Sequence, residues 1–133
     1  TLGLNIPYYG CDGWDGIIKQ LNGDTKNIEG ATYLTPFVAT DTSEKVQAFV
    51  NTYKEKYNAE PDQFAADGYD AVYAIKAAIE KAGDDTSNEA LVSAMTQISV
   101  NGLTGDMTFD ENGEPNKSAK VVVIKDGQYV AQN

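Results

Sequence analysis

The order in which apolar patterns follow one another is the feature that most restricts what this chain can fold into. A strand-like run at residues 4–9 leads through a glycine-flanked loop to a short helical pattern at 14–21, and a second β-branched run follows at 31–37. Three helical patterns then follow in succession, and only strand-like patterns come after them. This order does not describe one simple βαβ domain, so we predict an α/β chain that holds pieces of a larger α/β protein.

The first of the three successive helices is predicted from a start signal and a stop signal. Asp41 is followed three residues later by Glu44, as in a capping box, and Pro61 sets the limit of the helix. Apolar residues between them recur at helical spacing and predict one buried face, made of Val46, Phe49, Val50, Tyr53 and Tyr57.

The second helix is predicted over residues 63–82, with Gly83 as its C-terminal cap. Spacings of three and four residues predict an inward stripe made of Ala65, Tyr69, Val72, Ile75 and Ile79. Asp70 falls on the opposite side of this helix, and Asp67 is interpreted as a residue that caps or solvates the turn.

The third helix is predicted to open at a capping-box pair, Thr86 and Glu89, and to stop at Asn101 and Gly102. Its inward residues are Leu91, Ala94, Met95 and Ile98.

Short strands are predicted for the remainder of the chain. Residues 107–109 form one of them, and residues 119–124 and 128–130 pair as a hairpin across Asp126 and Gly127, a dipeptide typical of two-residue hairpin turns.

Charge and composition exclude several classes of partner and site. Twenty acidic residues against ten basic ones give a formal charge of −10, which disfavours nucleic acid and anionic membrane surfaces. The chain has no histidine, and its one cysteine, Cys11, excludes an internal disulfide and a Cys-rich zinc site. The acidic segment from Asp106 to Glu114 fails the EF-hand spacing and is interpreted as a reverse turn. We therefore expect no cofactor, no metal and no enzymatic activity.

No apolar run approaches the roughly 20 residues that span a bilayer, and no signal-peptide pattern begins at Thr1. We expect a soluble chain whose targeting segment lies outside it.

Two long segments carry a family resemblance. The segment FVNTYKEKYNAEPDQFAADGYDAVYAIKAAIEKAG, followed by GLTGDMTFDENGEPNKSAKVVVIKDGQYV, resembles the C-terminal part of type I solute-binding proteins for branched-chain amino acids. The opening IPYYGCDGWD and the later IEGATYLTPF fit as well. The resemblance runs over nearly the whole chain in the family's order.

The resemblance implies part of a type I periplasmic-binding-protein fold, in which two Rossmann-like lobes are joined by crossover segments. Residues 1–36 would belong to the second lobe, and residues 37–117, with three helices and a short strand, to the first. Residues 118–133 would return to the second lobe as a hairpin. The crossovers would lie near residues 37–40 and 115–117. Uncovered helix faces and strand edges would let the fragment dimerise or associate with the absent N-terminal portion.

By the same resemblance, the complete protein would capture a branched-chain or similar amino acid by closing its cleft and deliver it to the membrane permease of an ABC importer. It would act outside the cytoplasm, in the periplasm or as a cell-surface lipoprotein, and it would not be an enzyme. An alternative is the ligand-binding sensor domain of a receptor, because receptors reuse this architecture.

Asp12 is the first candidate ligand residue. It lies just past an apolar strand in a glycine-flanked loop, where open α/β sheets present groups to ligands. It matches the acidic position with which the family holds the ligand's α-ammonium group. The alternative is an aspartate that caps the helix near Trp14.

Phe64 and Trp14 are the aromatic candidates. Phe64 matches a position where the family places a ring against the ligand side chain, and ordinary core packing is its alternative. Trp14 would line the mouth of the cleft or pack against its own loop. In this family the ligand carboxylate is held by the absent portion, so we expect this chain alone to bind weakly or not at all.

Overall fold

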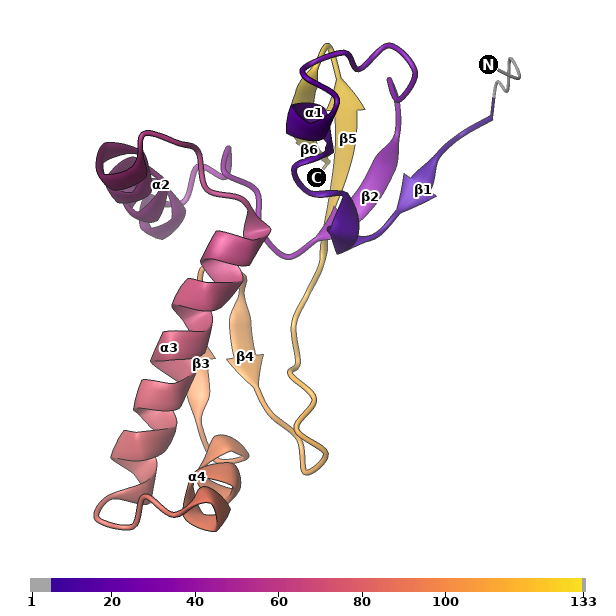
Figure 1. Ribbon diagram of the computed structural model, residues 1–133. Coiled ribbons are helices and arrows are strands. Elements are labelled where there is room, and N and C mark those ends of the chain that lie inside the picture. The colour runs from indigo at the N-terminus through magenta and orange to yellow at the C-terminus, as the bar shows by residue number, and fades with distance from the viewer. Residues whose placement is uncertain (1–5, 133) are drawn as a thin grey trace. The chain divides into compact units, whose positions relative to one another are not determined.

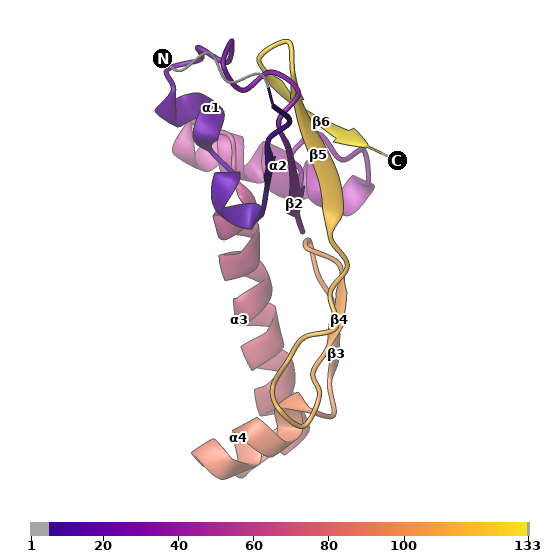
Figure 2. The same cartoon turned by 90° about the vertical axis from the view of Figure 1, so that its right-hand side faces the viewer.

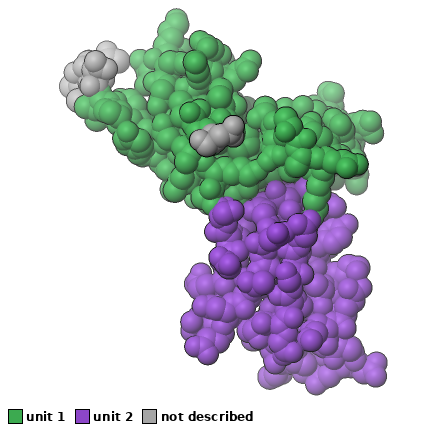
Figure 3. Space-filling view, turned by 180° about the vertical axis from the view of Figure 1, so that it is seen from behind, with its two compact units in different colours: residues 1–63, 119–133 green, residues 64–118 purple. Residues whose placement is uncertain are grey.

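The structure is a computed structural model that describes residues 6–132 and divides into two compact units. Unit 1 comprises Thr1–Gln63 with Ala119–Asn133, and unit 2 comprises Phe64–Ser118 (Figure 3). Because the described residues begin at 6, the first two residues of the predicted strand 4–9 lie outside them. The assignment of residues 1–36, 37–117 and 118–133 to the lobes of a complete protein is a different division and stays a prediction.

Unit 1 is built on a four-stranded mixed sheet with the strand order β1-β2-β5-β6 (Figures 1 and 2). Its strands and helices are β1 (Tyr9–Gly10), η1 (Asp12–Trp14), α1 (Ile17–Gln20), β2 (Thr32–Thr35), α2 (Glu44–Tyr57), β5 (Lys120–Lys125) and β6 (Gln128–Gln132). Strand β1 runs parallel to β2, β2 runs antiparallel to β5, and β5 runs antiparallel to β6. The predicted single helix at 14–21 is thus a 3₁₀ turn followed by one α-helical turn.

The C-terminal hairpin of unit 1 forms where the sequence predicts it. Asp126 and Gly127 connect β5 to β6 with positive φ angles of 52° and 73°, as a two-residue hairpin turn requires. The side chains of Val122 and Ile124 are fully buried, while the neighbouring Val121 is exposed. This period-2 alternation turns one face of β5 toward the core.

The core of unit 1 joins the sheet to the segment that follows β2. Tyr33, Val38 and Val122 form a buried cluster, with Trp14 and Tyr129 packed against it. The rings of Tyr33 and Tyr129 meet edge to face with centroids 6.0 Å apart.

Helix α2 ends as predicted but begins differently. Val46 and Val50 are buried, and the helix stops before Pro61 at Asn58, whose φ of 51° ends the helical path. The predicted capping box is wrong, because Ser43 is the N-cap residue. Asp41 instead accepts a hydrogen bond from the Ser43 amide at 2.8 Å and pairs with the ammonium group of Lys120.

This pairing predicts a pH dependence for unit 1. The hydrogen bond from Lys120, followed by that from the Ser43 amide, lowers the pKa of Asp41 from 3.8 to about 2. Because the folded-state pKa is depressed, the stabilisation is present above pH 4 and disappears as the pH falls toward 2. Solvent reaches both side chains, so we expect about 1 kcal/mol. Urea unfolding followed by Trp14 fluorescence should show this difference between Asp41→Asn and the parent at pH 7 and a clearly smaller one at pH 2. An equal difference at both pH values would contradict it.

Unit 2 packs two helices against a two-stranded ladder (Figure 1). Its elements are α3 (Gln63–Ala82), which begins with the last residue of unit 1, α4 (Asn88–Met95), β3 (Ser99–Asn101) and β4 (Asp106–Thr108). The buried cluster of this unit is made of Ala74, Ala78, Ala94, Ile98, Val100 and Met107. Gly83 follows α3 with a φ of 71°, as the predicted C-terminal cap requires.

The predicted inward stripe of α3 is wrong for this chain. Three of its members, Val72, Ile75 and Ile79, are 64%, 56% and 42% exposed. The face that packs within unit 2 carries small residues and one carboxylate instead, namely Ala66, Asp70, Ala74 and Ala78. Small side chains let the backbone of α3 approach its neighbours closely, so the buried face is not the one with the largest apolar residues.

Two further details of unit 2 differ from the prediction. Helix α4 is capped by Ser87, whose hydroxyl accepts from the Ala90 amide at 3.3 Å, and Thr86 is not the cap. The segment at Asn101 is not a helix stop, since the helix ends at Met95 and β3 pairs with β4.

Candidate functional site

The loop after β1 places Asp12 in solvent. β1 and β2 are parallel, and Asp12 follows the carboxyl end of β1 as the first residue of η1. Its side chain is exposed. The N-cap position of η1 belongs to Cys11, so Asp12 is not the residue that precedes the helix. An exposed carboxylate at this edge of a sheet is available to a ligand, and its ligand role stays a prediction.

Trp14 packs inside unit 1. Its ring belongs to the cluster around Tyr33, Val38 and Val122, and it also covers Gly10. A Cβ atom at position 10 would lie only 2.4 Å from the indole ring, so glycine is required there. This agrees with the alternative in which Trp14 packs against its own loop. A contact between Trp14 and a ligand stays a prediction.

Asp15 accepts several hydrogen bonds within unit 1, although it was not among the candidate residues predicted from the sequence. Its carboxylate accepts from the amide of Gly16 at 3.0 Å and from that of Gln63 at 2.6 Å, and the hydroxyl of Tyr33 is a third partner. Burial raises the pKa of Asp15, and the hydrogen bond from Gln63 opposes the rise without cancelling it. Burial and the nearby carboxylate also raise the pKa of Tyr33.

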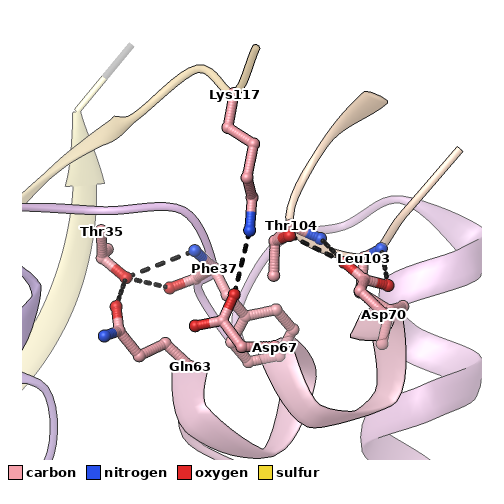
Figure 4. A network of polar contacts seen from close by, with 8 residues as sticks. All are labelled: Thr35, Phe37, Gln63, Asp67, Asp70, Leu103, Thr104 and Lys117. Atoms are coloured by element: carbon pink, nitrogen blue, oxygen red, sulfur yellow. Dashed lines mark hydrogen bonds and ion pairs between the residues drawn. The ribbon is translucent and has the colours of Figure 1, made fainter. Parts of the chain in front are cut away.

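A second buried polar contact joins the end of β2 to the first residue of α3. The hydroxyl of Thr35 donates to the Gln63 side-chain carbonyl at 2.8 Å and accepts from the amide of Phe37 at 3.3 Å (Figure 4). Gln63 is 1% exposed, and its Nε2 atom is a buried nitrogen with no partner among the described residues. These bonds hold the start of the segment predicted to be a crossover.

Phe64 lies on the first turn of α3, in unit 2. Its ring is 54% exposed, which does not fit the alternative of ordinary core packing in this chain. Phe64 and Asp12 belong to different units. The use of the Phe64 ring as a ligand contact stays a prediction.

Asp70 is buried in unit 2, opposite to its assignment to the outer side of α3. Its carboxylate accepts from the amides of Leu103 and Thr104, both at 2.8 Å, and from the Thr104 hydroxyl at 2.7 Å (Figure 4). A Cβ atom at Gly102 would lie 2.5 Å from the same carboxylate. Asp70 thus fixes the loop between β3 and β4. Asp67 on the same helix pairs with Lys117 at 3.0 Å and does not simply solvate the turn.

Within residues 6–132, no helix combines the length and apolar character needed to cross a membrane. The same residues contain no group of three or more His, Cys, Asp or Glu side chains arranged to hold a metal ion. The acidic segment considered for calcium is a turn, in which Asp110 accepts from the amides of Asn112 and Glu114, both at 2.9 Å.

Comparison with known proteins identifies the family. The sequence profile of the periplasmic binding proteins matches residues 1–128. Among solved structures, a leucine-binding protein from Thermotoga maritima is 32% identical, with a TM-score of 0.82 over 99% of this chain and 38% of that protein. The substrate-binding protein LivJ of a branched-chain amino acid transporter from Streptococcus pneumoniae, solved with isoleucine, is 26% identical. Its TM-score is 0.80 over 98% of this chain and 38% of that protein.

A third similar structure has a different kind of ligand. A solute-binding protein of an ABC transporter from R. palustris, in complex with benzoate, is 25% identical, with a TM-score of 0.80 over 96% of this chain and 35% of that protein. This chain thus spans less than two fifths of the length of each of these three relatives.

These findings confirm the fold class and the resemblance predicted from the sequence. The mixed sheet, the helices and the C-terminal hairpin superpose on part of the type I periplasmic-binding-protein fold. The profile match covers nearly every residue, and the relative solved with isoleucine is a substrate-binding protein of a branched-chain amino acid transporter. The chain belongs to the periplasmic binding protein family.

Proposed function

We propose that this chain is part of an extracytoplasmic solute-binding protein that captures an amino acid for an ABC importer and is not itself an enzyme. Family membership and the similarity to leucine- and isoleucine-binding proteins support the transport role. The exposed carboxylate of Asp12 at the carboxyl end of β1 is the observation that favours an amino acid. A carboxylate forms a charge-assisted hydrogen bond with an ammonium group.

The same carboxylate argues against benzoate as the ligand. Benzoate carries a negative charge and no donor, so an aspartate beside it would repel it. An amino acid presents an α-ammonium group that Asp12 can accept from, while Phe64 offers apolar contact to the side chain.

Cleft closure is the proposed mechanism. A ligand that contacts both lobes stabilises the closed form by its differential affinity for that form, and the closed form docks on the membrane permease. Asp12 and Phe64 would serve as contacts from this chain. The lipoprotein or periplasmic location belongs to the same proposal.

Calorimetric titration of leucine, isoleucine, valine and benzoate tests the proposal. It should be carried out on this chain and on the longest polypeptide that its gene encodes. We expect a branched-chain amino acid to bind to the longer polypeptide and only weakly or not at all to this chain alone, and we expect benzoate to bind to neither. Asp12→Asn should weaken amino acid binding about 10- to 100-fold, because the charge-assisted bond to the ammonium group is lost. Glu55→Gln on the exposed side of α2 removes the same charge and should have no effect.

Tight binding of benzoate, or amino acid binding that Asp12→Asn leaves unchanged, would overturn the assignment of Asp12. Binding of no tested solute by either polypeptide would overturn the amino acid class and favour a different ligand or a sensor.

A further inference from the structure

Unit 1 contains a cavity of about 710 Å³, a size typical of small-molecule sites. Its walls come from α1, from the segment that follows β2, from residues 60–62 and from the turn between β5 and β6. All four residues of the predicted crossover, 37–40, contribute to the wall. Neither Asp12 nor Phe64 lines the cavity, so it differs from the candidate amino acid site.

The carboxylate of Asp15 is one of the charged groups in the wall of the cavity. A carboxylate can accept about four hydrogen bonds, and three partners of Asp15 are identified here, from Gly16, Gln63 and Tyr33. These bonds do not fully replace the lost hydration, because burial still raises the pKa of the group. A positive charge in the cavity would therefore be stabilised by a carboxylate that the protein neutralises incompletely.

The other charged groups that line the cavity also favour a positively charged ligand. Glu60 and Asp62 add two acidic side chains, and Lys19 is the basic residue among those that line the cavity. Glu60 pairs with Lys54 at 2.8 Å, while its side chain remains 56% exposed. The lining thus carries three carboxylates against one ammonium group, which favours a cation over an anion.

Much of the remaining wall is apolar or aromatic. It is supplied by Ile18, Phe37, Val38, Ala39, Pro61 and Tyr129. These apolar side chains favour a ligand with an apolar body.

We propose that this cavity is a second ligand site, which binds a small primary amine with an apolar or aromatic body. The ammonium group lies against Asp15, and the apolar body lies against the segment 37–40. If the proposed function holds, such a ligand contacts a crossover and biases cleft closure, but binding itself does not depend on that function.

Phenethylamine is a suitable probe, and 3-phenylpropionate is its anionic counterpart of similar shape. Chemical-shift titration of the ¹⁵N-labelled chain should show that phenethylamine binds and shifts the amides of Ile18, Ala39 and Gly127. Asp15→Asn should weaken this binding at least about tenfold, because the charge is lost while the shape is kept. Ala39→Leu should also weaken it by filling the cavity, with the fold checked by circular dichroism.

Two controls separate this site from the proposed function. Asp12→Asn and Glu55→Gln should leave phenethylamine binding unchanged. Loss of binding in Asp12→Asn would place the amine at the candidate amino acid site and overturn the second site. No shift at 10 mM phenethylamine, equal binding of 3-phenylpropionate, or full binding by both Asp15→Asn and Ala39→Leu would also overturn it.

Discussion

Replacing Asp70 by alanine is expected to cost unit 2 about 3–5 kcal/mol of folding free energy. The carboxylate is 3% exposed and accepts from two backbone amides and one hydroxyl, those of Leu103 and Thr104. Both residues are themselves buried, so alanine leaves three donors without an acceptor and away from water. Hydrogen exchange of the Leu103 and Thr104 amides is the most direct measurement, and their protection should fall at least about 100-fold.

Asp67→Ala is the matched control, because it removes the same chemical group from the same helix. The Asp67 pair with Lys117 is partly solvated, with the two side chains 39% and 24% exposed. Such pairs contribute about 1 kcal/mol or less, so the protection of the Leu103 amide should fall no more than about fivefold. Equal effects of the two substitutions would mean that Asp70 does not hold the loop between β3 and β4.

Elements with local signals could be predicted from the sequence. The turn at Asp126 and Gly127 depends on the φ preferences of those two residues alone, and the hairpin formed as expected. The end of α3 is likewise set by Gly83, which follows it with a positive φ angle. Such signals act over a few residues, so they remain readable in a chain that covers only part of its relatives' fold.

Helix orientation could not be predicted, because α3 is apolar on more than one side. Periodicity finds the stripe with the largest side chains, which includes Val72 and Ile75, whereas this chain buries Ala74 and Ala78. The sequence near α3 contains no signal that shows which stripe packs against the other elements of unit 2. The strand Ser99–Asn101 was missed for a similar reason, since three residues leave no clear period.

In the candidate site, too, a position that depends on neighbouring residues could be predicted, and positions that depend on partners far away in the sequence could not. Asp12 lies in the glycine-flanked loop just after β1, and its exposed position could be inferred from the neighbouring glycines. Asp15 could not be recognised, because its partner Gln63 is 48 residues away and its partner Tyr33 lies on β2. Asp70 was placed on the wrong side because its three hydrogen-bond donors lie 33 and 34 residues further on.

Substitutions at two adjacent positions of α3, Ala74 and Ile75, test which face of the helix is buried. One of them is expected to destabilise unit 2 strongly. Ala74→Glu places a carboxylate in the core of unit 2, where Ala74 is 4% exposed, and should cost about 3 kcal/mol or more. Ile75→Glu changes a residue that is 56% exposed and should alter the stability of this chain by about 0.5 kcal/mol or less. Hydrogen exchange of α3 and α4 amides would measure both effects.

The result also decides between the two stripes of α3, because each makes the opposite prediction for this pair. If the stripe with Ile75 were buried in this chain, Ile75→Glu would unfold unit 2 and Ala74→Glu would be tolerated. The buried cluster of Ala74, Ala78 and Ala94 leads us to expect the reverse order. Ile75→Ala tests burial at this position without introducing a charge. Truncating an exposed side chain opens no cavity, so the exchange rates of the helix amides should stay nearly unchanged. A strong loss of protection in Ile75→Ala would show that the apolar face is covered, by a second copy or otherwise, under the conditions of the measurement.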